Sequence, residues 1–230
     1  MTQFMSNSLF FGAAISLIAY EAGLLLKRKF KMAIFNPLLI AIIAVIAVLC
    51  LLHIDYDTYN QSGQYISYLL TPATVCLAVP LYQQMELLKK NLKAVVIGIV
   101  SGVLASLVSV LILAKLFRLS HEQYVTLLPK SITTAIGMGV SEELGGIVTI
   151  TVAVIIITGV LGNMVAETVI KLAHIEEPIA KGLALGTSSH AIGTAKAMEL
   201  GEIEGAMSSL AIAVAGLLTV VGASVFAQFM

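Results

Sequence analysis

A lysine, a proline and several hydroxyl groups interrupt an apolar part of the chain near residue 130. Pro129 stands directly before Lys130 and Ser131, and Thr133 and Thr134 follow. A proline in this position predicts a helix start, where backbone N–H groups lack partners and carry a partial positive charge. The ammonium of Lys130 adds to that charge, so the segment predicts a site for an anion. In the competing interpretation Lys130 lies near a segment end and extends to the lipid headgroups.

A second polar segment lies between Lys181 and Gly205. It is rich in glycine, which weakens a continuous helix and lets neighbouring backbones approach closely. It carries a dense group of side-chain donors, Thr187, Ser188, Ser189, His190, Thr194 and Lys196. A buried histidine in a transporter can relay a proton, whereas one bonded to a nearby carbonyl has only a structural role. The sequence alone is consistent with both interpretations of His190.

Two prolines interrupt a third apolar segment, residues 69–84. Pro72 and Pro80 each remove a backbone donor, and Thr71 and Thr74 can bond the carbonyls that this releases. The segment is either a proline-kinked span or a broken helix that exposes backbone dipoles to a ligand.

No pattern of metal ligands or of covalent catalysis accompanies these segments. No second His, Cys or carboxylate stands at metal-ligand spacing from His190, and no GxSxG elbow occurs. The adjacency of Ser189 and His190 has no geometric meaning for a catalytic triad. Cys50 and Cys76 lack CxxC spacing and are expected to be small packing residues. The sequence therefore predicts neither an enzyme nor a bound metal or cofactor.

The elements that must position these residues are membrane helices. Of 230 residues, 59% are hydrophobic and 11% charged, whereas soluble domains carry about 25% charged residues. Crossing a bilayer takes roughly 20 apolar residues. Uncharged windows of about this length cover 33–52, 94–114, 147–166 and 205–230, the run 1–20 nearly qualifies, and 65–85 is expected to cross as well. The connector 167–181 is expected to form a short interfacial helix that ends near Pro178.

The distribution of charge predicts the orientation of the first half. Thirteen basic and thirteen acidic residues cancel, so the chain gives no sign of binding nucleic acid. The basic cluster 27–31 and the lysine-rich segment 86–93 are expected to be cytoplasmic, while Asp55 and Asp57 lie in an external loop. The N-terminus is then outside. The basic cluster follows the first apolar run, which argues against a cleavable signal peptide.

The chain also resembles itself when it is shifted by 114 residues. The shift aligns the apolar run 94–114 with 208–228, and the polar segment 71–85 with 185–199. This pattern predicts an all-α membrane protein of seven or eight transmembrane or broken helices, built from two structural repeats, 1–116 and 117–230. In such transporters the substrate site lies near the bilayer midplane, where each half contributes a discontinuous helix. Whether the halves are inverted or parallel stays open.

Five stretches of sequence resemble the LrgB/CidB family of bacterial membrane proteins. They are NPLL from Asn36, PATVCLAVPLY from Pro72, LPKSITTAIG from Leu128, ELGG from Glu143, and KGLALGTSSHAIGTAKAMELGEIEGAMSSLAI from Lys181. The resemblance covers essentially the whole chain, and the spelling of the PKSITTAIGMGVSEELGG and SSHAIGTAKA stretches looks closer to the CidB branch.

The resemblance implies a multi-pass protein of the bacterial cytoplasmic membrane. The family is described as antiholin-like or holin-like, modulates murein hydrolase activity and autolysis, and works with a small LrgA/CidA-type partner. It also resembles the plastidial glycolate/glycerate translocator of plants, and bacterial relatives are linked to pyruvate movement. The chain is therefore expected to be either a secondary transporter of small monocarboxylates or a regulatory subunit that carries no solute. Transport is favoured, because a regulator has no evident need for so many polar groups at membrane depth.

The expected substrate site combines the polar segments. A small organic anion would bind among Asn36, Thr71, Thr74, Pro129, Lys130, Ser131, Thr133, Thr134, Thr187, Ser188, Ser189, His190, Thr194 and Lys196. Lys130 or Lys196 would supply the charge, and the hydroxyl groups would supply hydrogen bonds. The other expected partners are the lipid bilayer and, from transporter architecture, a second copy of the chain.

Overall fold

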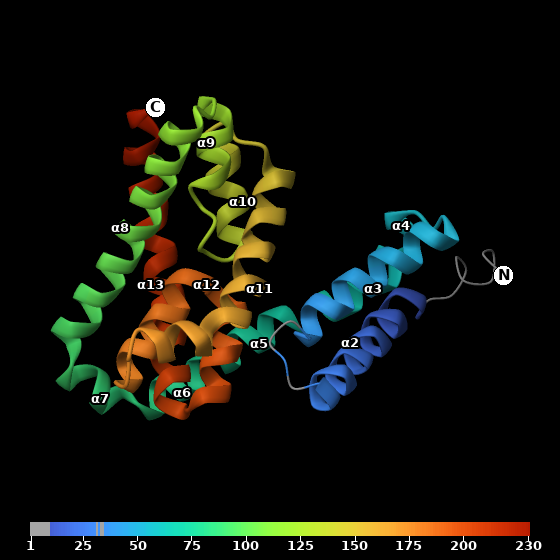
Figure 1. Cartoon of the computed structure of the whole chain (residues 1–230), viewed down its shortest axis with the longest axis horizontal. Coiled ribbons are helices and arrows are strands. Elements are labelled where there is room, and N and C mark those ends of the chain that lie inside the picture. The colour runs from blue at the N-terminus through green and yellow to red at the C-terminus, as the bar shows by residue number, and fades with distance from the viewer. Residues whose placement is uncertain (1–9, 31, 33–34) are drawn as a thin grey trace. The chain divides into compact units, whose positions relative to one another are not determined.

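The computed structural model describes residues 10–30, 32 and 35–230, with the side chain of Thr74 left out. Within these residues every regular element is a helix (Figure 1). This confirms the all-α prediction. The chain forms two compact units, Met1–Cys76 and Leu77–Met230, which are described separately.

The first unit contains α2 (Phe11–Phe30), α3 (Pro37–Leu52), α4 (Tyr56–Ser67) and α5 (Leu70–Cys76). α2 packs against both α3 and α4. The N–H of Gly12 donates to Ser62 Oγ over 2.6 Å, and Ser16 Oγ lies 2.8 Å from the Tyr59 hydroxyl. Polar side chains of α4 thus bond both the backbone and a side chain of α2. The first nine residues of the expected run 1–20 lie outside the described part of the chain.

The second unit begins with α6 (Ala78–Gln83) and α7 (Met85–Lys90). It continues with α8 (Leu92–Phe117), α9 (His121–Leu127), α10 (Thr134–Glu143), α11 (Val148–Leu172), α12 (Pro178–Leu200), α13 (Glu202–Phe226) and the short helix η1 (Ala227–Phe229). α8, α12 and α13 pack on one another, α11 packs on α12, and α10 packs on α11 (Figure 1). α6 also packs against α13.

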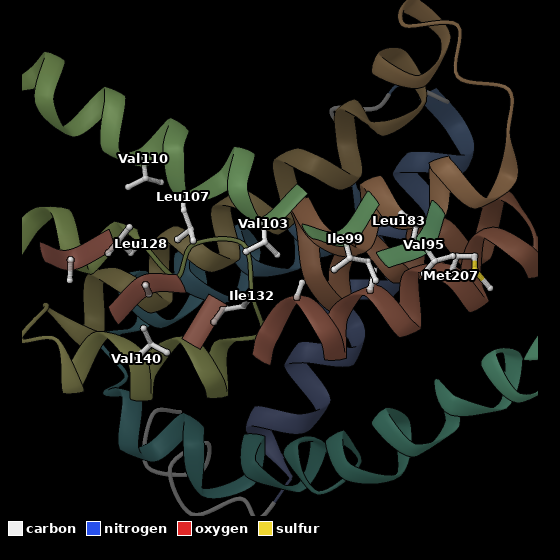
Figure 2. Close-up of a cluster of buried hydrophobic side chains, with 14 of the residues drawn as sticks. Val95, Ile99, Val103, Leu107, Val110, Leu128, Ile132, Val140, Leu183 and Met207 are labelled. Carbon is white, nitrogen blue, oxygen red and sulfur yellow. The ribbon is translucent and has the colours of Figure 1, made fainter. Parts of the chain in front are cut away.

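One face of α8 supplies much of the core of the second unit. Val95, Ile99, Val103 and Leu107 are buried and recur every four residues, which places them on one side of the helix. They form one cluster with Leu128, Ile132, Val140, Leu183 and Met207 (Figure 2). Lipid is as apolar as these side chains. The cluster therefore stabilises the unit mainly through close packing contacts rather than by leaving water.

Four helical stretches of the described chain are long and apolar enough to cross a bilayer. They are Tyr56–Gln83, Leu92–Phe117, Val148–Leu172 and Glu202–Phe229. These agree with the expected crossing 65–85 and with the windows 94–114, 147–166 and 205–230. Within the window 33–52, residues Pro37–Leu52 form α3, an apolar helix of 16 residues. The number of crossings and the repeat with its boundary at residue 116 stay predictions.

The expected helix start directly after Pro129 is wrong. α10 begins at Thr134, with Thr133 as its N-cap residue. The residues between α9 and α10 form turns, in which the N–H of Lys130 donates to Leu127 O over 3.2 Å and that of Ile132 to Pro129 O over 3.3 Å. A proline fits such a turn as well as it fits a helix start, because it has no N–H to place.

The expected interfacial helix at 167–181 is also wrong. α11 continues through this region to Leu172, and Pro178 begins α12 instead of ending a helix. Proline suits the first position of a helix, since the N–H that it lacks would have no partner there.

Candidate functional site

A groove of about 810 Å³ lies between α8, the turn at residues 129–131 and the first half of α12. It brings together two of the predicted polar segments, because Lys130 and Ser131 line it beside Thr187 and Ser188. The α8 side consists of Asn91 and small residues, which leave the space open. Glu177, which precedes α12, also lines the groove and places one negative charge in its wall.

Lys130 is the only basic side chain in the lining of this groove. Its Nζ donates to Ser131 Oγ over 3.0 Å, and Ser106 Oγ of α8 donates to the same oxygen over 3.0 Å. Within the described residues, no carboxylate lies within ion-pair distance of this ammonium. A half-buried ammonium without a counter-ion attracts an anion.

A network of buried hydroxyl groups fixes the turn that carries Lys130. Thr126 Oγ1, at the end of α9, accepts from the N–H of Ile147 over 2.8 Å. Thr151 Oγ1 of α11 lies 2.9 Å from Thr126 O and 2.6 Å from Ser141 Oγ of α10. These bonds join the three helices that flank the turn. They also provide hydrogen-bond partners for buried hydroxyl, carbonyl and N–H groups that would otherwise need water.

α12 is interrupted at Ser189 and His190, within the glycine-rich segment. The backbone angles there are φ −132°, ψ 15° for Ser189 and φ 42°, ψ −137° for His190, neither of which is helical. A positive φ is uncommon and unfavourable for a residue with a side chain. The interruption divides α12 into a first half, 178–188, and a second half, 191–200.

α11 supports the interruption with a carbonyl and two glycines. His190 Nε2 lies 3.0 Å from Ile155 O. The imidazole packs on Gly159, where an added Cβ would lie 2.7 Å from the ring, and Ser189 packs on Gly162, where an added Cβ would overlap its Oγ. Because glycine has no side chain, these two positions of α11 leave the space that Ser189 and His190 occupy.

The second half of α12 is joined to α11 by polar contacts. Asn163 Nδ2 donates to Ile192 O over 3.0 Å. Lys196 Nζ lies 2.6 Å from Glu167 Oε1 and 3.0 Å from Glu199 Oε2. Two carboxylates thus balance the charge of Lys196, which does not line the groove. Of the two lysines expected to attract an anion, the groove contains only Lys130.

The other candidate residues lie outside the lining of the groove. Pro129 is buried in the turn, and Thr133 and Thr134 are half-buried at the start of α10. Thr194 is buried, and its Oγ1 lies 2.7 Å from Ser208 Oγ of α13.

Three candidates belong to the first unit. Asn36 caps α3, where its Oδ1 accepts from the N–H groups of Leu38 over 2.9 Å and Leu39 over 3.2 Å. Thr71 is exposed on α5. The side chain of Thr74 lies outside the described part of the chain.

The serines of α8 line the groove but were not among the predicted site residues. They are Ser101, Ser106 and Ser109. The hydroxyls of Ser101 and Ser109 donate to Gly98 O over 2.9 Å and to Ser106 O over 2.7 Å. Serine and glycine at intervals of three to five residues in an apolar helix indicate a closely packed or polar face. That signal was present in the window 94–114.

Comparison with known proteins gives consistent matches. A family model described as the LrgB-like family matches residues 16–229. Proteins named antiholin-like protein LrgB from Bacillus mycoides (strain KBAB4), Bacillus cereus (strain B4264) and Bacillus anthracis (strain CDC 684 / NRRL 3495) are each 40% identical to the chain over 221 residues. Each alignment covers 96% of the chain and 96% of the relative. No solved structure matches the chain.

Proposed function

Because the chain belongs to the LrgB-like family, whose relatives are named antiholin-like proteins, we propose that it carries small monocarboxylates such as pyruvate, glycolate or glycerate across the bacterial cytoplasmic membrane. The observation that carries this proposal is Lys130. It is a half-buried lysine that faces an open groove and has no carboxylate partner among the described residues.

The groove offers what a short carboxylate requires. An ammonium has three N–H donors, and in the described chain only Ser131 accepts from that of Lys130. Donors therefore remain for a substrate carboxylate. The exposed hydroxyl of Ser188 lies in the same lining and suits the hydroxyl or keto group of such an acid.

The interruption of α12 supports placing the site at mid-depth in the membrane. Its first half has eleven residues (178 to 188), about 16 Å at 1.5 Å per residue, which is roughly half of a hydrocarbon core of about 30 Å. Under the proposed repeat of 114 residues, Ser189 and His190 correspond to residues 75 and 76. Those residues precede the break at Leu77 between α5 and α6. This correspondence supports two repeats with discontinuous helices, in a protein of seven or eight transmembrane or broken helices.

The names of the relatives favour a second candidate function. An antiholin-like protein would act as a non-transporting subunit that controls murein hydrolase activity together with a holin-like, LrgA/CidA-type membrane partner. The small residues of α8 would then serve helix packing. Neither candidate function involves catalysis.

Transport by the purified protein in liposomes tests the first function. We expect uptake of radiolabelled pyruvate or glycolate, and a fall of at least about tenfold in Lys130→Met. A hydrogen bond to a charged group contributes about 1.5–3 kcal/mol, and 1.4 kcal/mol corresponds to a factor of ten. Lys115→Met is the matched control, because Lys115 is exposed near the end of α8 and does not line the groove.

The same variants distinguish the two functions in cells. If neither acid enters the liposomes, and Lys130→Met restores normal autolysis to a deletion strain, the regulatory function replaces transport. If the wild-type protein transports and Lys130→Met transports equally well, the groove is not the substrate site.

A further inference from the structure

A second cavity, of about 410 Å³, lies among the C-terminal part of α11, the connector 173–177 and the two helices α12 and α13. It shares no lining residue with the groove. Most of its lining residues are charged or titratable, and one of them, Glu204, is buried. The proposed substrate site does not use this residue.

Glu204 is a buried carboxylate without a protein partner. It is the third residue of α13 and only 8% exposed. Its carboxylate packs over Gly201, where an added Cβ would overlap Oε2. Among the described residues no cation pairs with it and no donor bonds it. Every fully covered side-chain nitrogen or oxygen atom of the described residues has a hydrogen-bond partner. The unpartnered oxygens of Glu204 are therefore not fully covered, and they retain access to the cavity.

The other charged groups of the cavity do not neutralise Glu204. They are Glu167 and Lys171 on α11, His174 and Glu176 in the connector, and Lys181 on α12. Glu167 already pairs with Lys196 at 2.6 Å and with Lys171 at 3.7 Å. Lys181 lies beyond ion-pair distance of Glu204. Burying a carboxylate without a partner is costly, so one that is retained in a membrane protein is a candidate ion-binding residue.

We propose that Glu204 binds the cation that drives transport, either a proton or a monovalent metal ion, an assignment that rests on the proposed transport function. A divalent ion would need more ligands, and the described residues contain no group of three metal-binding side chains. The N-terminus of α13 carries a partial positive charge, which stabilises the carboxylate once the cation has left. Binding at this position is therefore reversible, as coupling requires.

The first half of α12 connects this cavity to the groove. Lys181 lines the cavity, and Gly182 packs on the backbone oxygen of Glu204, where an added Cβ would lie 2.5 Å away. The adjacent residues Ala180 and Leu183 line the groove. A cation at Glu204 and an anion at Lys130 therefore act on opposite sides of one short helix, and each can change the affinity for the other.

Uptake into liposomes under separate proton and sodium gradients tests this proposal. In Glu204→Gln we expect gradient-driven accumulation to fall at least about tenfold, while exchange of labelled for unlabelled substrate at equal concentrations continues. Glu202→Gln, an exposed neighbour at the start of the same helix, should keep both activities. A response to the proton gradient alone identifies a proton, and a response to the sodium gradient alone identifies a metal ion.

The outcomes separate this proposal from the proposed function. If the wild-type protein moves no acid, the transport function fails. If the wild-type protein accumulates an acid and Glu204→Gln accumulates it equally well, the role of Glu204 is overturned.

A labelling experiment tests the site without transport and without a variant. Dicyclohexylcarbodiimide is an apolar reagent that reacts with protonated carboxyl groups, including those that are largely buried. We expect mass spectrometry of the wild-type protein to find the adduct at Glu204 at low pH, with less labelling at high pH or, for a metal site, on addition of sodium. Absence of the adduct at every pH, or labelling that neither pH nor sodium changes, overturns the proposal.

Discussion

His190 Nε2 lies 3.0 Å from the carbonyl oxygen of Ile155, at the point where α12 is interrupted. The side chain of Ile155 packs on the other side against Gly137 of α10. A single residue of α11 thus contacts the helix that follows the Lys130 turn and also the interruption of α12. The two polar segments recognised in the sequence are held by a common support, which explains how they come to face one groove.

Replacement of His190 should reveal the strain of its backbone. Both His190→Ala and His190→Gly remove the imidazole, but φ 42°, ψ −137° is unfavourable for alanine and accessible to glycine. We expect His190→Ala to be less stable than His190→Gly by about 1–3 kcal/mol. Unfolding of the two variants in detergent, followed by circular dichroism, measures the difference. Equal stability would mean that the backbone at residue 190 is not constrained.

The close contact of Gly162 with Ser189 predicts a steric effect. Gly162→Ala places a methyl group on Ser189 Oγ and should lower the thermal midpoint. The second change Ser189→Gly should recover part of the loss, since it removes the side chain that the methyl group meets. Gly139→Ala on α10 is the control, because no atom lies within 4 Å of an added Cβ there. That control should be neutral or stabilising by up to about 1 kcal/mol. A destabilised control would show that the bundle tolerates no alanine in these helices.

The two lysines that contact Glu167 should differ in their contribution. Lys196 lies at 2.6 Å with its side chain 12% exposed, whereas Lys171 lies at 3.7 Å and is 77% exposed. In double-mutant cycles with Glu167→Gln, we expect a coupling of about 1 kcal/mol for Lys196→Met and less than about 0.5 kcal/mol for Lys171→Met. Added salt should reduce the second coupling more than the first. Equal coupling energies would show that the Lys196–Glu167 ion pair holds the second half of α12 no more strongly than an exposed ion pair does.

Cross-linking across the groove tests its geometry. Ser106 Oγ and Ser131 Oγ lie 3.0 Å apart, so Ser106→Cys with Ser131→Cys should form a disulfide in a background that lacks Cys50 and Cys76. The bond should abolish uptake, and a reductant should restore it. The pair Ser101→Cys with Ser131→Cys is the control, since residue 101 lies about 7.5 Å further along α8. Cross-linking of both pairs at equal rates would contradict the geometry of the groove.

The sequence predicts the long helices well for a simple physical reason. The apolar windows that correspond to α8, α11 and α13 lack charges over their whole length, and the hydrocarbon leaves the backbone few alternatives to a helix. Helix ends are harder to predict. Pro129 lies in a turn and Pro178 begins a helix, yet both positions suit a residue without an N–H.

The candidate site is predictable as a set of segments but not as a geometry. Polar residues are conspicuous in an apolar chain. For this reason the sequence predicts Lys130, Ser131, Thr187 and Ser188, which do line the groove. The interruption of α12 decides which residues of this segment face the groove. It turns the side chains of Ser189 and His190 toward α11 instead. Lys196 has a partner on another helix, Glu167, and no local pattern reveals that pairing.

The interruption of α12 also changes how the helix responds to force. Backbone hydrogen bonds keep a continuous helix stiff, but here the regular conformation stops at residues 189 and 190. The second half is anchored to α11 through Asn163 and Glu167. The first half instead packs closely on the backbone of α13 at Gly182 and Gly186. A force on one half of α12 therefore reaches the other through the neighbouring helices and not only along its own backbone.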